Sequence, residues 1–154
     1  MIFLVFKIGK DRYAMEAARV VEVLPKVRLK AIPQSPPSIA GVLDYHGSPV
    51  PVVDLSAVAT GTSARDSLST RLVVIHYPTP AGEECLLGLV VEMGTETVRF
   101  QNDDFQAPGV STPEARYLGP VASDARGMIQ RVEIEHLLPA EVRGRLWQQA
   151  REAV

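Results

Sequence analysis

The sequence predicts an all-β fold with minor helix, arranged as small β-barrels or as a β-sandwich. About eight to ten short apolar runs of strand length alternate with turns rich in Gly, Pro, Asn and Asp. No long helical period occurs before the C-terminal segment. A chain of 154 residues has the length of one domain, or of two small subdomains that share a core. We therefore treat residues 1–154 as a single domain.

Three strands are expected in the first 25 residues. Apolar runs at Ile2–Ile8 and Arg12–Met15 flank a Gly-Lys-Asp turn, and a third run covers Val20–Leu24. Strict alternation in this strand predicts two faces, one with Val21 and Val23 and the other with Val20, Glu22 and Leu24. The second face is apolar except for the charge of Glu22, which is unusual for a core. The third strand therefore suits a partly exposed contact surface.

The stretch Ile39–Leu55, IAGVLDYHGSPVPVVDL, predicts a β-hairpin, because two apolar runs flank the polar break His46-Gly47-Ser48. Pro49 and Pro51 lie two residues apart, so their missing N–H groups fall on one side of the strand. This favours a sheet edge, a strand start or a bulge there. His46 at the mouth of the turn is either a solvated turn residue or a recognition residue on a rigid support.

A small polar segment follows the hairpin. Asp54 has the character of an N-cap for a short helix over Leu55–Ala59. The segment Thr60–Ser69, TGTSARDSLS, then predicts a mobile loop near the junction of two groups of strands. Closing each group into a small barrel would remove most exposed strand edges.

The second half of the chain contains another hairpin, formed by Arg71–Tyr77 and Glu84–Glu92. The second run is almost wholly apolar and is expected to be central. Gly88 inside it indicates a bulge, a barrel corner or close backbone packing. Further strand signals follow at 95–100, 117–122 and 127–132.

A C-terminal helix is expected over about 140–153, after Pro139. Val142, Leu146 and Ala150 recur at helical spacing and form an apolar stripe. Gly144 weakens this helix by about 1 kcal/mol relative to Ala. The stripe is expected to cover a barrel end, with the docking of a partner as the alternative.

Composition narrows the classes of function. The net charge is −2 and basic residues are not interleaved with aromatics, so neither nucleic-acid binding nor membrane binding is supported. Residues 1–30 carry seven Lys/Arg against three Asp/Glu, whereas residues 71–110 carry two against six. A basic and an acidic side of this kind suit protein docking. The single cysteine and the lack of a signal peptide or apolar span favour the cytoplasm.

Signals for chemistry are weak. His46, His76 and His136 are widely separated, and HxxxH, HExxH and CxxC patterns are absent, so no metal or cofactor is expected. Cys85 and His76 would face each other in the second hairpin and could form an activated thiolate, which leaves a small Cys/His enzyme as an alternative. A ligand-binding barrel is the other alternative, although dense Val and Leu content argues for filled interiors.

Four segments in this order resemble the CheW-like adaptors of bacterial chemosensory arrays. They are FKIGKDRYAMEAARVVEVLP, IPQSPPSIAGVLDYHGSPVPVVDL, ECLLGLVVE and GMIQRVEIEHLL. The resemblance runs through nearly the whole chain. It implies two SH3-like five-stranded β-barrels that share a core, with a C-terminal helix and without catalysis.

The resemblance also implies partners. Members of the family bridge the regulatory domain of a CheA-type histidine kinase to the cytoplasmic tip of chemoreceptors at membrane-associated arrays, and weak self-association is compatible with this role. The receptor tip would lie in an apolar groove between the barrels. The implied receptor-binding residues are Val20, Glu22, Val23, His46 and Gly47. The implied kinase-binding residues are Gly88, Val91, Gly94, Thr97 and Val98.

The chain departs from the family pattern at several of these positions. The family usually has Arg where His46 stands, and Arg carries a permanent charge and more donors than His. Gly94 and Thr97 stand at positions that are usually apolar, and Arg131-Val132-Glu133 stands where Leu-Leu-Asp is commoner. These changes lead to the hypothesis of a divergent member that serves an alternative, non-flagellar pathway.

Overall fold

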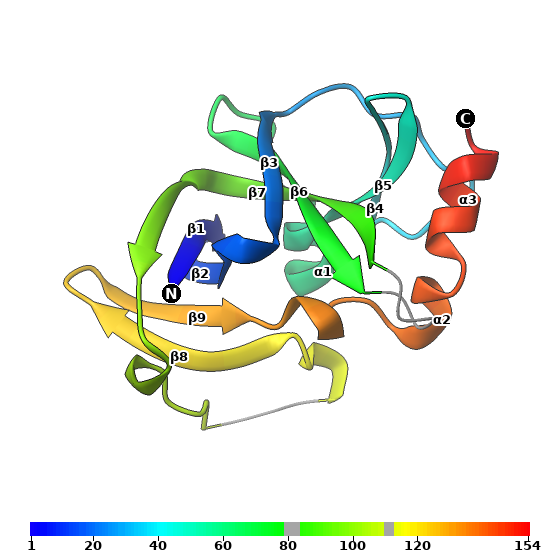
Figure 1. The fold of residues 1–154 in the computed structure, drawn as a ribbon. Helices are drawn as coiled ribbons and strands as arrows, with labels where there is room; N and C mark the ends of the chain where they lie inside the picture. Colours follow the sequence, from blue (N-terminus) through cyan, green and yellow to red (C-terminus); the bar gives the residue numbers. More distant parts are fainter. Residues whose placement is uncertain (79–83, 110–112) are drawn as a thin grey trace.

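The structure is a computed structural model, and it describes residues 1–78, 84–109 and 113–154. Strands dominate the described part, and helices are short (Figure 1). The strands are β1 (Ile2–Ile8), β2 (Asp11–Glu16), β3 (Val20–Pro25), β4 (Ile39–Tyr45), β5 (Ser48–Asp54), β6 (Thr70–Pro78), β7 (Glu84–Arg99), β8 (Leu118–Asp124) and β9 (Gly127–Val132). The α-helices are α1 (Leu55–Thr60), α2 (Ala140–Arg143) and α3 (Leu146–Glu152), and the 3-10 turns are η1 (Ala17–Arg19), η2 (Asn102–Asp104), η3 (Pro113–Ala115) and η4 (Ile134–His136).

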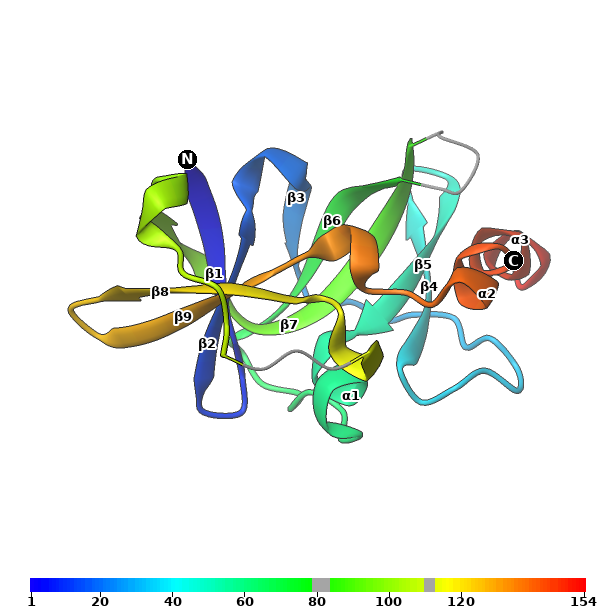
Figure 2. The same ribbon diagram turned by 90° about the horizontal axis from the view of Figure 1, so that it is seen from below.

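Strand β7 joins the two halves of the molecule (Figures 1 and 2). Its first half pairs with β6 from Glu84 to Glu92, and Gly88 to Val90 pair in parallel with β5. Its second half, up to Arg99, pairs with β1. Glu92 is in register with both Thr70 of β6 and Lys7 of β1, so the two halves meet at this residue.

Each half forms a small five-stranded barrel around β7. The first barrel has the order β7-β1-β2-β9-β8, and the second has the order β3-β6-β7-β5-β4. An isolated bridge links the open side of each barrel: Gln106 pairs with Val121 in the first, and Lys30 pairs with Val42 in the second. The prediction of an all-β fold built from two small barrels is confirmed.

Of the four apolar clusters in the described residues, three fill the barrels and the space between them. Six buried residues fill the first barrel and six fill the second, and the largest cluster lies between the barrels and takes residues from both. The barrels therefore share a core, as the family resemblance implies. The first interior contains Phe3, Val5, Ala14, Phe100, Ala122 and Ile129; the second contains Leu43, Val50, Val52, Leu72, Val74 and Val90.

The loop at 60–69 does not separate the two groups of strands, contrary to the prediction. Strands on both sides of this loop, β3 to β6, lie in the second barrel, while β1 and β2 join the C-terminal strands β8 and β9. The reason is a parallel pairing between β2 and β9, in which Arg12 is in register with Ile129 and Ala14 with Arg131. This pairing connects the two ends of the chain, and no local sequence signal reports it.

Local expectations around the first hairpin are confirmed. Pro49 and Pro51 lie in the first part of β5, before its parallel pairing with β7 begins at Val52. Their missing N–H groups therefore do not interrupt a ladder on that side. The carboxylate of Asp54 accepts a hydrogen bond from the Ala57 N–H at 3.2 Å and caps α1.

The C-terminal segment is two helices rather than the single helix expected over 140–153. The break falls at Gly144 and Arg145, where Arg145 has φ −124° and leaves the helical region. Gly144, the weak point expected from propensity, ends α2. Leu146 and Val142 pack on the core shared by the barrels, while Ala150 is buried in a small cluster with Val42 of the second barrel. The stripe therefore packs on the fold itself.

Candidate protein-binding surfaces

Strand β3 is an edge strand whose apolar side chains are partly exposed. It pairs with β6 on one side and with no described strand on the other. Val21 is 40% exposed and Val23 is 37% exposed, while Val20 packs against the core shared by the barrels. An edge strand with exposed valines is open to contact with another protein.

A bulge at Val21 changes the faces of β3 from those that simple alternation predicts. The register shifts between Val20 and Glu22, so Val20 lies opposite Ile75 and Val23 lies opposite Val73. Val20 and Val23 consequently share the face that looks toward the core between the barrels. The other face carries two residues, Glu22 opposite Val74 and Leu24 opposite Leu72.

The turn between β4 and β5 consists of His46 and Gly47. Both have positive φ, 53° for His46 and 87° for Gly47, as a type I′ turn requires. The Gly47 N–H donates a hydrogen bond of 2.9 Å to the carboxylate of Asp44, which stabilises the turn. His46 is exposed at the tip, so its ring is available to a partner.

Closure of the second barrel brings this turn to the edge of β3. The hydroxyl of Tyr45 donates a hydrogen bond of 2.7 Å to Oε1 of Glu22. The rings of Tyr45 and His46 meet edge to face, with centroids 4.5 Å apart. The five receptor-binding residues implied by the resemblance therefore lie along one connected edge, although the chain separates them into two segments.

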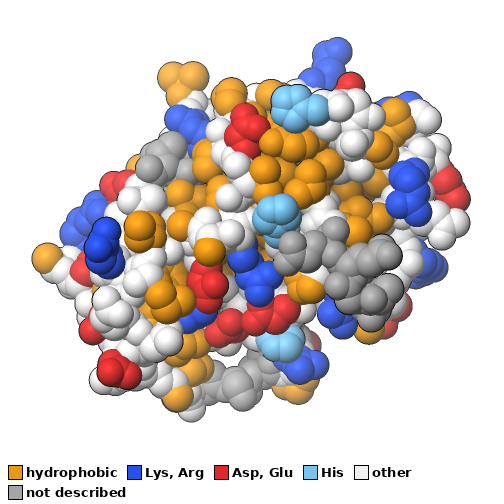
Figure 3. Space-filling view, in the orientation of Figure 1, with side chains coloured by type: hydrophobic (Ala, Val, Ile, Leu, Met, Phe, Trp, Pro, Cys, Tyr) orange, Lys and Arg blue, Asp and Glu red, His pale blue; other side chains and the backbone are white. Residues whose placement is uncertain are grey.

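Figure 3 shows the face that carries this edge. Hydrophobic side chains gather over β3 and β6 in the upper middle of the view, with histidine side chains at their border. The hydrogen bond with Glu22 raises the pKa of Tyr45 above its ordinary value, so this hydroxyl stays protonated and continues to donate at neutral pH. The surface thus combines an apolar strip with one oriented carboxylate.

The implied kinase-binding residues fall into different environments along β7. Gly88 lies inside the second barrel, and Val91 is 2% exposed in the shared core. The expectation that these two contact a partner directly is wrong, because the barrels already enclose them. Thr97 is exposed and Val98 is half-buried against the first barrel's interior. Gly94 lies outside the residues whose surroundings are described.

The predicted Cys85–His76 pair does not form. In the β6–β7 hairpin Cys85 is opposite Tyr77, whereas His76 is opposite Leu86. Neighbouring strand residues point to opposite faces, so the thiol and the imidazole project to different sides of the sheet. This geometry removes the arrangement on which the enzyme alternative rested.

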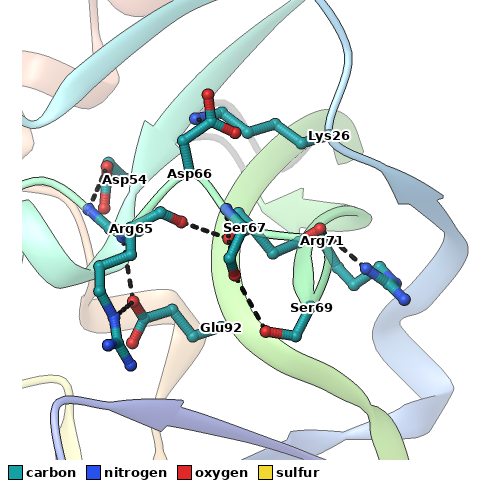
Figure 4. Close-up of polar contacts among 10 residues, drawn as sticks. Lys26, Asp54, Arg65, Asp66, Ser67, Ser69, Arg71 and Glu92 are labelled. Carbon is teal, nitrogen blue, oxygen red and sulfur yellow. Dashed lines mark hydrogen bonds and ion pairs between the residues drawn. The ribbon is translucent and has the colours of Figure 1, made fainter.

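Two buried carboxylates hold the loop at 61–69 against the barrels (Figure 4). Asp54 accepts the Ala64 N–H at 3.0 Å, and Glu92 accepts the Arg65 N–H at 3.0 Å. The hydroxyl of Thr70 donates to the carbonyl of Arg65 in addition. These hydrogen bonds tether the loop, whereas the sequence predicted a mobile one. Both buried carboxylates therefore have backbone N–H groups as hydrogen-bond partners.

One hollow of about 620 Å³ opens at the side of the second barrel, where Leu29, Ala40 and Val90 line it. Buried side chains fill both barrel interiors, as the Val and Leu content suggests. A groove of about 700 Å³ runs along the outer surface between α1 and the C-terminal turns, with Val58, Tyr117 and Leu138 among its walls. A ligand cavity inside a barrel, the second alternative, is not found in the described part of the chain.

Two further searches of the structure concern metals and membranes. Within residues 1–78, 84–109 and 113–154, no three side chains of His, Cys, Asp or Glu gather as a metal site would require. None of the helices described there is long and apolar enough to cross a bilayer.

Sequence reasoning missed Tyr45 and Glu92, and it found only one of the two hydrogen-bonding roles of Asp54. Tyr45 stands next to His46 in the printed sequence, but its partner Glu22 lies on another strand, and only barrel closure brings the two together. Asp54 was expected only to cap α1. Glu92 stands at the end of an almost wholly apolar strand, and this position is only a weak indication that its carboxylate is buried.

Comparison with known proteins agrees with this geometry. A family model described as the CheW-like domain matches residues 3–142. The chemotaxis protein CheW of Klebsiella aerogenes is 25% identical over 141 residues, which cover 90% of this chain and 82% of that protein. Protein FrzA of Myxococcus xanthus is 35% identical over 72 residues, 47% of this chain and 45% of that protein.

A solved structure shares the fold. The crystal structure of scaffolding protein TtCheW from Thermoanaerobacter tengcongensis superimposes with a TM-score of 0.78 at 22% sequence identity. The match covers 90% of this chain and 87% of that chain, so both barrels are included.

Proposed function

Because the chain belongs to the CheW-like domain family, we propose that it is a non-enzymatic adaptor that couples chemoreceptors to a CheA-type histidine kinase. The Klebsiella aerogenes relative is named a chemotaxis protein, and the matching structure is titled a scaffolding protein. The observation that carries the proposal is the convergence of β3 and the His46–Gly47 turn on one exposed edge. The site of action would be the cytoplasmic side of membrane-associated receptor arrays.

The receptor contact in this proposal is the edge of β3. Val20 and Val23 face the core between the barrels, and Val23 is 37% exposed there. Val23 and the carboxylate of Glu22 project from opposite faces of β3 but lie along the same open edge, which suits a helix with an apolar face and one polar position at its border. A chemoreceptor tip, a helical hairpin, offers such a face.

The kinase contact in this proposal is the second half of β7. From Glu96 to Arg99 this strand pairs with β1 on one side and with no described strand on the other. Thr97 is exposed along it, and Val98 reaches the first barrel's interior. A partner strand or loop could pack along this edge, and Gly88 and Val91 would support it from within the fold.

We keep the hypothesis of an alternative, non-flagellar pathway as part of the proposal. Its support is the altered contact chemistry: His46 replaces the usual Arg at the tip of the turn. A permanently charged fork and a titrating ring select different partner groups. A dedicated receptor would account for the change.

The test is a binding experiment with Val23→Glu. Purified protein is titrated with two probes, a soluble chemoreceptor tip fragment and the regulatory domain of a CheA-type kinase. Val23 is 37% exposed, so the variant is expected to fold, whereas an unpaired charge buried in the contact should weaken tip binding by about tenfold or more. Kinase binding should be unchanged.

Val27→Glu is the matched control. Val27 is 38% exposed but lies beyond the end of β3, so the same charge there should leave tip binding within about twofold. Equal effects of the two variants would place the contact elsewhere. Absence of binding by the folded wild type to either probe would contradict the proposed function itself.

A further inference from the structure

Tyr45 connects two parts of the proposed receptor contact. Its ring packs against the aliphatic interior of the second barrel, and its hydroxyl reaches out to Glu22 at 2.7 Å. The neighbouring ring of His46 meets it edge to face at 4.5 Å between centroids. One residue therefore ties the tip of the β4–β5 hairpin to the open edge of β3.

The carboxylate of Glu22 would otherwise be poorly ordered. Glu22 is exposed on an edge strand, and a glutamate loses substantial rotamer freedom when it is fixed. Tyr45 holds one oxygen, Oε1, while Oε2 makes no hydrogen bond to the described residues and stays open to a partner. Ordering a side chain before binding reduces the entropy lost on binding.

The chemistry around this oxygen defines what would bind it. Along the same open edge, Val21 in the bulge is 40% exposed and Val23 on the opposite strand face is 37% exposed. No Lys, Arg or His of the described residues lies within ion-pair distance of Glu22, so its negative charge is uncompensated. A complementary group is a Lys or Arg set among apolar residues on a helix.

We propose that Tyr45 is a positioning residue that orients Glu22 to receive a basic side chain from the receptor helix docking on β3. This inference rests on the proposed function and adds the partner's chemistry to it. Tyr45 itself does not contact the basic group. Its hydroxyl fixes the carboxylate, and its ring, braced by His46 and the barrel interior, fixes the hydroxyl.

A purely structural role for Tyr45 would give a different result. The hydroxyl could serve only to link β4 with β3 at the open side of the second barrel. Its removal would then lower thermal stability and affect every partner alike. A positioning role affects only the partner that uses Glu22.

The experiment is a double-mutant cycle on tip binding. The variants are Tyr45→Phe, Glu22→Ala and the double variant, and the probes are the soluble chemoreceptor tip fragment and the kinase regulatory domain. Tyr45→Phe keeps the ring and should weaken tip binding about 3- to 10-fold, as expected when one charge-assisted hydrogen bond is lost. In the Glu22→Ala background the same change should have no further effect. Tyr13→Phe is the control: the ring of Tyr13 stacks on Phe6 beside the shared core, away from β3, so its change should leave tip binding unaltered.

The outcomes separate the two proposals. Kinase binding and melting temperature should stay at wild-type values in Tyr45→Phe, and Glu22→Ala should reduce the salt dependence of tip binding. Equal loss of tip and kinase binding, or an undiminished effect of Tyr45→Phe in the Glu22→Ala background, overturns the positioning role. If the wild type binds the tip fragment and Tyr45→Phe binds it equally well, this inference alone is overturned. A folded wild type that binds no tip fragment overturns the proposed function with it.

Discussion

The two barrels have the same number of strands but differ in the apolar side chains that fill them and in the ion pairs that join their strands. The first barrel contains three aromatic rings, Phe3, Phe100 and Phe105, with neighbouring centroids 5.2 to 6.3 Å apart. The buried residues of the second are all Leu and Val, and its one ring, Tyr45, packs at the border of this cluster. Large rings fill space by themselves, whereas branched aliphatic side chains fill it only if the strands approach closely.

The ion pairs that join the strands of the two barrels differ as well. Arg12 and Asp124 join β2 to the end of β8 in the first barrel, with side chains only 10% and 26% exposed. In the second barrel, Lys26 pairs with Asp66 at 3.6 Å and Arg65 pairs with Glu92 at 3.5 Å, and Asp66 and Arg65 are 84% and 86% exposed. A partly buried pair with two hydrogen bonds contributes more than a solvated one. The Arg12–Asp124 pair is thus expected to stabilise the first barrel more than either ion pair stabilises the second.

This difference bears on the proposed function because the two contacts lie on different barrels. The proposed receptor contact is on the second barrel, and the proposed kinase contact is on the part of β7 that belongs to the first. Stability changes confined to one barrel should therefore affect the two partners unequally. The variants below test that separation, from the largest expected effect to the smallest.

Gly88→Val should give the largest loss of stability. A Cβ at Gly88 would lie 2.8 Å from Cγ2 of Val52 and 3.3 Å from Cδ2 of Leu72, inside the second barrel. Overpacking of this kind should lower the free energy of unfolding by about 3 kcal/mol, measured by chemical denaturation. Gly109→Ala, where a Cβ meets nothing within 4 Å, is the control. Equal stability of Gly88→Val and wild type would contradict the close packing of the second barrel.

Asp124→Asn should have an intermediate effect that depends on pH. Asp124 accepts two hydrogen bonds from Arg12, at 2.8 and 2.7 Å, and a third from the Arg126 N–H at 2.8 Å. These bonds to Arg12 and Arg126 hold the pKa of Asp124 well below its usual range. At neutral pH the substitution should lower the free energy of unfolding by about 1–2 kcal/mol.

The sign of the pH dependence follows from the lowered pKa of Asp124. Its contribution is complete above the unfolded-state pKa of about 4 and is lost as the pH falls toward the folded-state value. The difference between wild type and Asp124→Asn should shrink below about pH 4. Asp66→Asn in the second barrel is the control and should change stability by less than about 0.5 kcal/mol at any pH. A difference that stays constant with pH would contradict the role of the first barrel's ion pair.

His46→Arg should have the smallest effect on stability and a selective effect on binding. His46 occupies a positive-φ turn position at the protein surface, so stability should change by less than about 0.5 kcal/mol. Binding of a tip fragment from a receptor whose adaptor carries Arg at this turn should improve about threefold, because Arg adds charge and donors. Titration calorimetry with that fragment checks this. An unchanged affinity would indicate that His46 is only a solvated turn residue and does not contact the receptor.

Most elements could be predicted from the sequence because their signals are local. Alternating apolar runs located the strands, Asp54 was confirmed as the cap of α1, and the prolines of β5 stand where the strand lacks a second partner. Of the three explanations considered for Gly88, the structure supports close packing. Each of these signals lies within a few residues of the feature that it predicts.

The remaining features depend on long-range pairing that a single sequence does not reveal. The β2–β9 pair assigns strands to barrels, and closure of the second barrel joins Tyr45 to Glu22. The bulge at Val21 moves Val20 to the face of Val23, and one shifted residue is enough to do so. Gly88 and Val91 resemble contact positions in the family pattern, but their burial is a property of the folded sheet.

The most direct test of the account is whether one molecule of the protein holds both partners at once. The protein, a chemoreceptor tip fragment and a CheA-type regulatory domain are mixed and analysed by size-exclusion chromatography with light scattering. The account predicts a complex that contains all three, from which Val23→Glu removes only the tip fragment. Mutually exclusive binding of the two partners, or loss of both in folded Val23→Glu, would contradict it.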